Sequence, residues 1–394
     1  MLGLLVVLGI AALLAAMRAE HGVSTTLPET TGPFAVARAV YDWTDDKTLD
    51  TLAPDPGTKR ELLVWIWFPA AQGPSGATYD YLPDAVQIAV ERSSGVLFSK
   101  FLTRDLAKVH GHSQPHAVMS SQERAYPVVI MRAGASAEVW NYSTLAEDLA
   151  SHGYVVVGFD APYRTHVVVF PDGRVMHRLP ENNPEVCEGI TGGEQERCAN
   201  RLLGAWTADM AFVLDRLEQL NASDVTGEFT GRLDMSRVGV FGHSFGGAAA
   251  LQFCQDDSRC KAGVDVDGAP HGSVIRSGVN RPFMILLSDH SGEHDSRGAQ
   301  VMADLRSIYD HLPPDGRPFL EIRGANHFLF SDDGALLKSH IVVRAMRLLG
   351  VVGIDGRRQL AVTSYCLRSF FDAELKGGKF DARSSIYPEI QALQ

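Results

Sequence analysis

The sequence has no excess of positive charge, no internal repeat of fixed period and no low-complexity tract. It carries 36 Lys and Arg against 47 Asp and Glu, which gives a formal net charge of −11 at pH 7. Binding to a phosphate backbone needs a basic surface, so this charge balance argues against nucleic acid as a partner. The lack of a repeat excludes solenoid architectures.

Cysteine is scarce, with 5 in 394 residues, and neither close pair has the spacing of metal ligands. Cys187 and Cys198 enclose "EGITGGEQER", and Cys254 and Cys260 enclose "QDDSR". Two short-range pairs and the remaining Cys366 predict two local disulfides formed in an oxidising compartment. The alternative is five unrelated thiols of a cytosolic protein. The pattern indicates no zinc site, and no other feature of the sequence calls for a metal or a cofactor.

The N-terminal run "MLGLLVVLGIAALLAAM" contains no charged side chain and ends at Arg18. It predicts that residues 1–19 are a signal peptide or a membrane anchor, followed by a linker at 20–34 that is rich in Thr, Pro and Gly. The protein is then exported, to the periplasm or the extracellular space, or held at a membrane. No basic residue precedes the run, which is also slightly short for a full span. The alternatives are therefore the tail of a larger membrane segment and a buried core helix.

Short apolar runs alternate with segments of helical periodicity along the rest of the chain. Most of the later runs are apolar on both faces, as strands of a covered parallel sheet are. We therefore expect an α/β fold with a mostly parallel, doubly wound sheet and antiparallel strands at its start. The expected strands are 34–41, 61–69, 126–131, 154–160, 237–242, 261–267, 281–289 and 317–324, and the expected helices are 141–153, 201–221, 334–350 and 358–378.

Residues 35–394 are expected to form a single domain with insertions near 84–116 and 171–200. The first insertion carries an apolar stripe at helical spacing, and the second is polar and holds the first cysteine pair. Each insertion could cap a binding cleft. Otherwise, the first is a helix packed on the sheet and the second is a surface loop.

Ser244 stands in "GHSFGG", between the apolar run 237–242 and an alanine-rich segment that begins at Phe245. A G-x-S-x-G motif between a strand and a helix is typical of a nucleophile elbow, in which a strained turn exposes the serine hydroxyl. The helix that follows directs its N–H groups and the positive end of its dipole towards the reacting centre. The alternative is a tight strand-to-helix corner without chemistry.

A nucleophilic serine needs a histidine base, and the histidine is oriented by an acid. His327 in "GANHFLFSDD" follows the last expected strand, which fits the chain order serine, acid, histidine. Asp267 ends one strand and Asp289 ends the next, and their spacing does not separate them, although the commonest arrangement favours Asp289. Asp265 lies on the same strand face as Asp267, in a supporting position.

Four segments together resemble the platelet-activating factor acetylhydrolase family of α/β-hydrolases, between about residues 60 and 375. They are "PVVIMRAGASAEVWNYSTLAEDLASHGYVVVGFD", "VFGHSFGGAAALQ", "CKAGVDVDGAP" and "GANHFLFSD". The resemblance implies an α/β-hydrolase fold and a metal-free serine esterase that removes short or oxidised acyl chains from phospholipids. In that family the acid follows the strand after the nucleophile, so the resemblance favours Asp267 over Asp289 as the partner of Ser244 and His327.

The resemblance also implies an oxyanion hole made by backbone N–H groups of Phe245 and Ala135. Family members carry a His-Gly-x-Gly-like turn at the second position, where this chain has Ala133-Gly134-Ala135-Ser136. The histidine is thus replaced by alanine and the second glycine by serine, which puts the shape of the hole and its fit to substrate in doubt. In some members an amphipathic helix binds lipoprotein or membrane surfaces. Residues 95–109 occupy a similar position, either for interfacial binding or as a packed structural helix.

The sequence therefore predicts a serine carboxylic ester hydrolase acting on a small ester or lipid, with a possible membrane surface as partner through the N-terminus or residues 95–109. A broad carboxylesterase or a cutinase-like polyesterase is the first alternative, and Asp289 as the acid would favour it. A non-catalytic binding protein of the same fold is the second.

Overall fold

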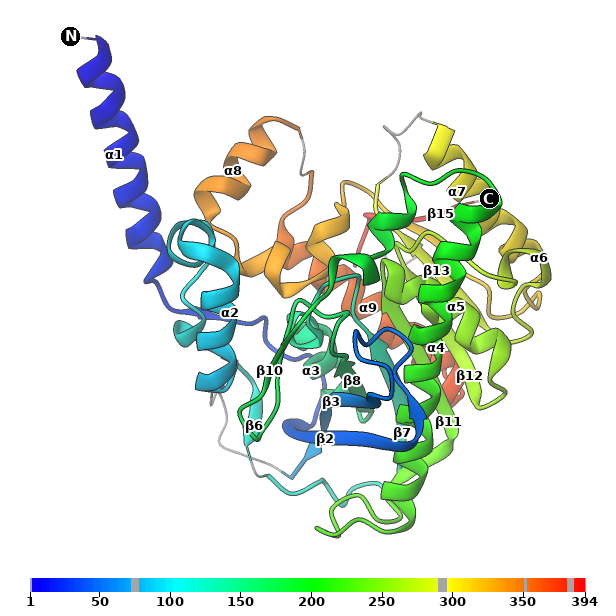
Figure 1. Ribbon diagram of the computed structural model, residues 1–394. Helices are drawn as coiled ribbons and strands as arrows, with labels where there is room; N and C mark the ends of the chain where they lie inside the picture. Colours follow the sequence, from blue (N-terminus) through cyan, green and yellow to red (C-terminus); the bar gives the residue numbers. More distant parts are fainter. Residues whose placement is uncertain are drawn as a thin grey trace.

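A computed structural model describes residues 2–71, 78–115, 117–289, 296–350, 353–380 and 386–393. A 10-stranded sheet runs through the molecule (Figure 1). In order across the sheet, the strands are β15 (Ile390–Ala392), β14 (Phe319–Ile322), β13 (Phe283–Leu287), β12 (Cys260–Val266), β11 (Leu233–His243), β7 (Tyr126–Arg132), β8 (Val155–Asp160), β3 (Lys59–Ala70), β2 (Ala35–Leu49) and β6 (Ser113–Pro115).

The centre of the sheet is parallel and its early strands are antiparallel. Strands β7, β8, β11, β12, β13 and β14 pair in parallel with one another, and β15 pairs antiparallel with β14. β3 pairs antiparallel with both β2 and β8. Strands β7, β8 and β13 are buried along their whole length, which is why they read as continuous apolar runs. The predicted sheet is confirmed, and each of the predicted strands overlaps an observed one.

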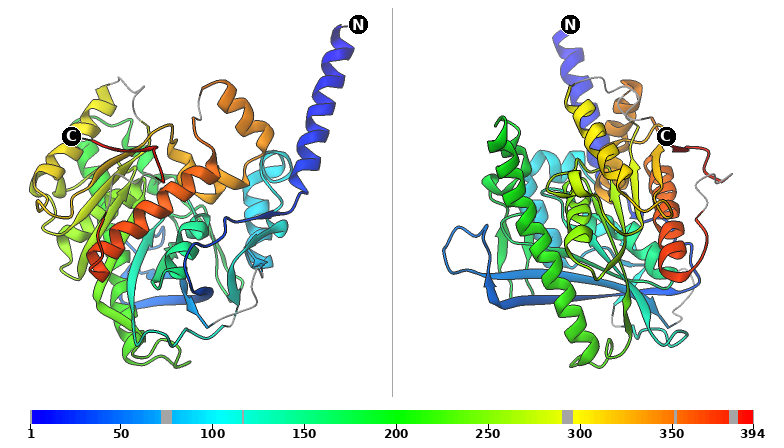
Figure 2. Two further views of the ribbon diagram at one scale, coloured as in Figure 1. Left: turned by 180° about the vertical axis from the view of Figure 1, so that it is seen from behind. Right: turned by 90° about the vertical axis from the view of Figure 1, so that its right-hand side faces the viewer.

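Helices cover both faces of the sheet, as the edge-on view shows (Figure 2). One face packs against α3 (Ser143–Ser151) and α9 (Gly356–Lys376), and the other against α4 (Gly193–Ala222) and α5 (Phe245–Asp256). Further helices are α6 (Val274–Ser277), α7 (Ser296–Asp310) and α8 (His340–Leu348). The expected helix 334–350 is therefore shorter than predicted, since α8 begins at His340 after a single turn at Asp333–Leu337.

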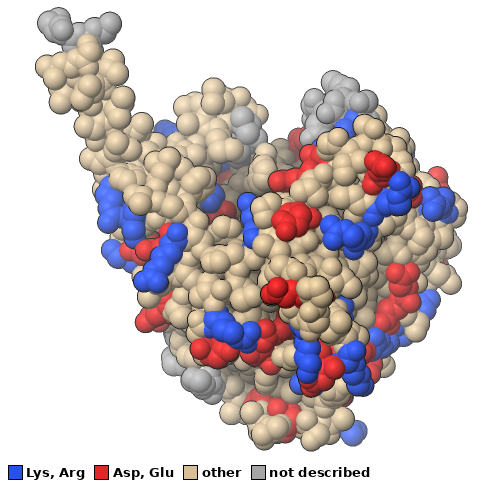
Figure 3. Space-filling view, in the orientation of Figure 1, with Lys and Arg blue, Asp and Glu red and all other residues tan. Residues whose placement is uncertain are grey.

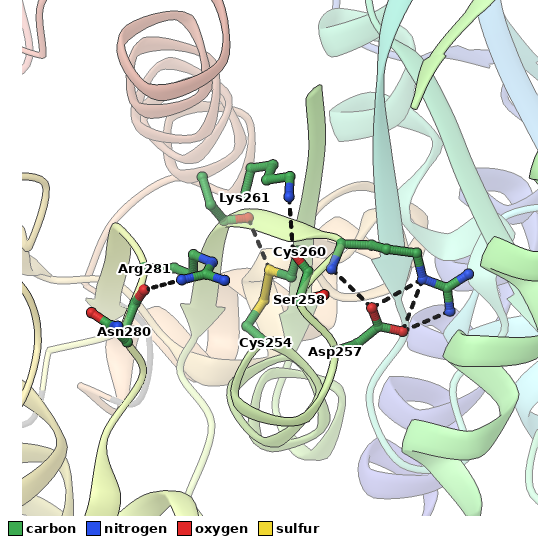
Figure 4. Close-up of a disulfide and its surroundings, with 9 residues drawn as sticks. Cys254, Asp257, Ser258, Cys260, Lys261, Asn280 and Arg281 are labelled. Carbon is green, nitrogen blue, oxygen red and sulfur yellow. Dashed lines mark hydrogen bonds and ion pairs between the residues drawn. A yellow bond between two sulfur atoms is a disulfide. The ribbon is translucent and has the colours of Figure 1, made fainter. Parts of the chain in front are cut away.

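Both predicted disulfides are confirmed. Cys187 is joined to Cys198, and Cys254 is joined to Cys260. The second bond ties the end of α5 to the start of β12, beside the Asp257 carboxylate (Figure 4). Cys366 is a buried free thiol.

The segment 171–200 has more regular structure than a polar loop. It contains part of a hairpin, β9 (Val167–Val169) and β10 (Val175–His177), which pair antiparallel. Helix α4 begins at Gly193, earlier than the predicted residue 201. The Cys187–Cys198 disulfide ties this early helical turn to the loop that follows the hairpin.

The apolar stripe at 95–109 does not form one helix, so the prediction of a helix over these residues is wrong. Helix α2 (Asp84–Leu97) is interrupted at Gly95, whose φ of 74° and ψ of 161° lie outside the helical region. A single wide turn follows at Phe98–Leu102, then a 3₁₀ turn at Leu106–Lys108 and strand β5 (Val109–Gly111). A glycine with positive φ reverses the chain where the apolar spacing alone predicts continuity.

Helix α1 (Leu2–His21) projects away from the sheet (Figure 1). Its residues Gly3–His21 are long and apolar enough to cross a membrane, with a mean hydropathy of 1.9, and only 6% of that window is buried. This exposure argues against a buried core helix. Beyond it, β1 (Thr25–Thr26) pairs with β5, and β5 pairs with β4 (Tyr79–Asp80), so part of the predicted linker lies in a small 3-stranded sheet.

Candidate active site

Ser244 occupies the turn between β11 and α5, with φ 56° and ψ −128°. A non-glycine residue adopts this region only when its surroundings enforce it. The glycines around it are required by close backbone approach. A Cβ atom at Gly242 would collide with the Gly246 carbonyl, and one at Gly246 would collide with the carbonyls of Arg132 and Ala133. The motif therefore packs strand, turn and helix too closely for any side chain at these two positions.

His327 lies against Ser244 and Asp267. Its Nε2 is 3.1 Å from the Ser244 Oγ, and its Nδ1 is 2.7 Å from the Asp267 Oδ2. With Nδ1–H donated to the carboxylate, Nε2 accepts from the serine hydroxyl. The structure thus brings three sequence-predicted residues into one hydrogen-bonded line.

The two candidate acids have different surroundings. The Asp267 carboxylate also accepts from the Ser288 N–H at 2.8 Å and from the Ser288 hydroxyl at 2.7 Å. The Asp289 Oδ2 accepts from the Gly324 N–H at 2.6 Å, in the loop before His327. Asp267, and not Asp289, is therefore the carboxylate that the structure pairs with the imidazole.

Asp265 lies fully buried next to Asp267, and its Oδ1 accepts from the Gly268 N–H at 2.9 Å. Burial, together with the negative charge of Asp267, raises the pKa of the Asp265 carboxyl well above its usual range. Through its bond to the Gly268 N–H, Asp265 shapes the turn after β12, while Asp267 contacts the imidazole.

His243, the residue before Ser244, connects two loops of the site. Burial, followed by the nearby charge of His327, lowers the pKa of His243 to about 3, so its ring is neutral. Its Nε2 lies 3.0 Å from the His327 carbonyl oxygen, which can only accept, so Nε2 carries the proton. Its Nδ1 then accepts from the Tyr142 hydroxyl at 2.7 Å. That hydroxyl in turn accepts from the Gly134 N–H at 3.2 Å.

The turn 133–136 lies directly against the serine. A Cβ at Gly134 would come within 3.3 Å of the Ser244 Cβ. Ala135 lines the same cavity as Ser244, and Phe245 begins α5. Ser136 has a left-handed backbone, with φ 61°, in a region that favours glycine. Its hydroxyl accepts from Arg178 at 2.9 Å and from Asn183 at 3.0 Å, so the insertion 171–200 holds this turn.

A cavity of about 380 Å³ opens over Ser244 and His327, which is within the usual range for small-molecule sites. Its walls come from the turn at 134–137, from the segment 98–106 after α2, and from residues 327–338. The first insertion and the loop that begins at His327 thus both face Ser244.

Sequence reasoning missed Tyr142 and the connecting role of His243. The position of His243 next to the nucleophile was the only available signal. Tyr142 lies 101 residues before His243 in the chain, and no sequence pattern relates the two positions.

Two family models match the chain, each over less than half of it. The model for platelet-activating factor acetylhydrolase, isoform II, matches residues 21–167, and a PET hydrolase-like model matches residues 207–350. The first stretch contains the turn at Gly134, and the second contains Ser244, Asp267 and His327.

Curated relatives point to the same group of proteins. A probable 1-alkyl-2-acetylglycerophosphocholine esterase of Arthroderma benhamiae is 25% identical over 94% of both chains. A platelet-activating factor acetylhydrolase of Cavia porcellus is 23% identical over 78% of this chain and 69% of its own. Cutinase 2 of Thermobifida cellulosilytica is 31% identical over 40% of this chain and 65% of its own.

A solved structure shares the fold over nearly the whole chain. The ferulic acid esterase from Streptomyces cinnamoneus superposes with a TM-score of 0.75 at 24% identity, covering 94% of this chain and 100% of that one. Together these findings confirm the predicted resemblance to the platelet-activating factor acetylhydrolase family and add a likeness to cutinases.

Proposed function

We propose that this chain, a carboxylic ester hydrolase of the platelet-activating factor acetylhydrolase and cutinase type, works through a Ser244–His327–Asp267 triad and an acyl-enzyme intermediate. One observation carries the proposal: the two hydrogen bonds of 3.1 Å and 2.7 Å that join Ser244 to His327 and His327 to Asp267. The distances are those of a nucleophile, a base and an orienting acid.

In the proposed mechanism, the Ser244 hydroxyl attacks the ester carbonyl while His327 Nε2 takes its proton. Asp267 holds the imidazole in the correct tautomer and stabilises the imidazolium that forms. The backbone N–H groups of Phe245 and Ala135 donate to the tetrahedral oxyanion. His327 then protonates the departing alcohol, activates a water molecule, and the acyl-serine is hydrolysed.

The proposed substrates are short-chain or phospholipid-type esters, in line with the names of the relatives that cover most of the chain. A cutinase-like or broad carboxylesterase activity is the second candidate, because the stretch with Ser244, Asp267 and His327 matches the PET hydrolase-like model. Rates on a short-chain phospholipid and on a polyester film distinguish the two.

We further propose that the protein is exported and held at a membrane by α1. The apolar helix and the two disulfides are consistent with export. The end of α1 is bonded to residues next to the cavity wall at Lys338: the Glu20 carboxylate accepts from the Ser339 hydroxyl at 2.5 Å and from the His340 N–H at 2.6 Å. The His21 ring donates to the Thr103 carbonyl at 2.8 Å.

The test is hydrolysis of p-nitrophenyl butyrate by a Ser244→Ala variant, with Ser258→Ala, at an exposed serine, as the matched control. We expect Ser244→Ala to lose about 10⁴-fold or more in kcat and all labelling by a fluorophosphonate probe, while the control keeps both. Equal rates for Ser244→Ala and the parent would refute the triad. Failure of the parent to react with the probe would favour a non-catalytic binding protein.

A further inference from the structure

A second depression adjoins the catalytic cavity. It is an open groove of about 680 Å³, lined by residues of α2 and of β10, and α2 packs against β9, the partner of β10 in the hairpin. α2 and β10 lie side by side in Figure 1. The groove shares two lining residues, His166 and Arg178, with the cavity over Ser244. A molecule bound in the cavity can therefore extend into the groove without leaving the surface.

The groove is cationic although the chain is acidic overall. Arg92, His166, His177 and Arg178 line it, and none of its lining residues in the described part of the chain is acidic. Neither arginine forms an ion pair among the described residues, and the neighbouring Glu91 is paired with Lys100 at 2.7 Å. In a chain of net charge −11, the two arginines give this groove a local positive charge that no described carboxylate neutralises.

Both arginines offer N–H donors that an oxyanion can accept from. A guanidinium has five donors, and at Arg178 the structure uses Nη1 for the Ser136 hydroxyl at 2.9 Å. Arg178 also lies close enough to His166 for its charge to lower the pKa of that ring, after the larger effect of burial. Arginine donors in this arrangement bind carboxylate or phosphate oxygens better than any neutral group.

Apart from Ser93, the remainder of the groove is apolar. Ile88 is 49% exposed and Val175 is 43% exposed, and Ala85 and Ala89 complete this part of the lining. A free inorganic anion would leave this surface in contact with water, whereas an amphipathic molecule would cover it. The lining thus fits an anionic group that is attached to an apolar chain.

We propose that this groove binds an anionic oxygen group, a phosphodiester or a carboxylate, that is carried by the ester substrate itself. The proposal rests on the esterase function proposed above and specifies its substrate class: amphipathic esters with a negative charge outside the reacting ester. The Ser136 bond of Arg178 links the groove to the turn that is proposed to supply an oxyanion donor. The anionic group and the reacting ester are then held by adjacent parts of one surface.

The test compares three soluble butyrate esters: a neutral one, one whose alcohol carries a phosphodiester, and one whose alcohol carries a carboxylate. The variants are Arg92→Gln and Arg92→Gln/Arg178→Gln, with Arg281→Gln as the control. Arg281 lies away from the groove, beside Asn280 and the Cys254–Cys260 disulfide (Figure 4). We expect the ratio of kcat/KM for the anionic ester to that for the neutral ester to fall about tenfold for each arginine removed, mainly through KM. The ratio of Arg281→Gln should equal that of the parent.

A fall confined to the phosphodiester ester, or to the carboxylate ester, supports the groove and identifies its anion. An unchanged ratio in the double variant, or an equal fall in the Arg281→Gln control, overturns it. Binding is measured separately from catalysis, by calorimetry of Ser244→Ala with a non-hydrolysable ether analogue of the phosphodiester ester. If the triad proposal fails, the Ser244→Ala variant still hydrolyses the neutral ester. If the groove proposal fails, the Ser244→Ala/Arg92→Gln double variant binds the analogue as tightly as Ser244→Ala alone.

Discussion

Asp267 and Asp289 follow neighbouring strands, and their carboxylates have different partners. An Asp267→Asn variant keeps the shape of the side chain but removes the charge that orients and stabilises the His327 ring. We expect kcat on p-nitrophenyl butyrate to fall by about 10³- to 10⁴-fold. Asp289→Asn retains an oxygen that can accept from the Gly324 N–H, so its kcat should stay within about tenfold of the parent. A larger loss in Asp289→Asn than in Asp267→Asn would exchange the proposed roles.

Tyr142 is the second residue whose effect can be isolated. Tyr142→Phe removes the hydroxyl that joins the Gly134 N–H to His243 Nδ1 and leaves the ring in place. We expect kcat to fall about fivefold with little change in KM, because a net hydrogen bond contributes about 1 kcal/mol and the turn and the His327 loop lose their shared restraint. Thermal unfolding of the variant provides the control. A fall in melting temperature with unchanged kcat would show that the bond supports the fold alone.

Among the elements, the loop between β14 and α8 carries His327 and is held on two sides. The Asn326 N–H donates to the Gln359 side chain of α9 at 3.0 Å, and the Gln359 amide donates back to the Asn326 carbonyl at 2.9 Å. Further along, the Asp332 Oδ2 accepts from the Thr144 N–H of α3 and from the Tyr81 hydroxyl, both at 3.2 Å. Helices from distant parts of the chain therefore fix the position of the base.

Asp332 also makes the stability of this loop depend on pH. Burial raises the pKa of its carboxyl to about 7, against an ordinary value of 3.8. Between these two values the folded protein keeps a proton that the unfolded chain releases, so stability falls as pH rises from about 4 to about 7. Asp332→Asn does not titrate and should show a smaller fall in urea midpoint between pH 5 and pH 7.5. Asp160, whose pKa burial also raises to about 7, is unchanged in both proteins, so the difference belongs to Asp332. Equal falls in the two proteins would contradict this assignment.

Among the elements, the buried strands of the parallel sheet are the ones that the sequence predicts best. Strands such as β7 and β13 are buried on both faces, and the runs that form them carry apolar residues almost continuously. Helix α7 was missed because its sequence is largely polar, and among its residues of described burial only Leu305 and Ile308 are fully buried. The break at Gly95 was missed because spacing predicts continuity and carries no information on a glycine's φ.

In the candidate site, too, some residues could be predicted from the sequence and others could not. Ser244 and Asp267 come directly after a strand and His327 lies in the loop after β14, at the edge where parallel strands bring their carboxyl ends together, which is why the sequence could predict them. The partner of the imidazole could be chosen only with a family resemblance, since two aspartates satisfied the topology. The cationic groove had no sequence signal, because its arginines come from α2 and from the segment after β10, which are far apart in the chain.

At the scale of the whole molecule, exposed apolar side chains lie at the ends of α2 and α8, and the exposed Phe98 and Phe328 line the catalytic cavity. Val96 and Leu97 at the end of α2 are 74% and 58% exposed, and Leu348 at the end of α8 is 83% exposed. α1, the end of α2 and α8 project from the same side of the molecule, and the parts seen in Figure 3 are mostly uncharged (Figures 1 and 3). With α1 in a bilayer, these side chains would lie at its surface, and the cavity would open towards the lipid.

This orientation predicts different behaviour towards soluble and bilayer-embedded esters. A Val96→Asp/Leu348→Asp double variant places two charges where the proposed contact with lipid occurs, outside the residues that line the cavity. In full-length protein reconstituted into vesicles, we expect its rate on a bilayer-embedded ester to fall at least about fivefold, because burying a charged group in lipid is costly. The rate on a soluble butyrate ester should hold. Val225→Asp is the matched control, since Val225 is a fully exposed apolar residue in the loop after α4, away from α1. If Val225→Asp lowers the vesicle rate as much as the double variant does, the apolar rim has no specific role and α1 alone brings the enzyme to its substrate.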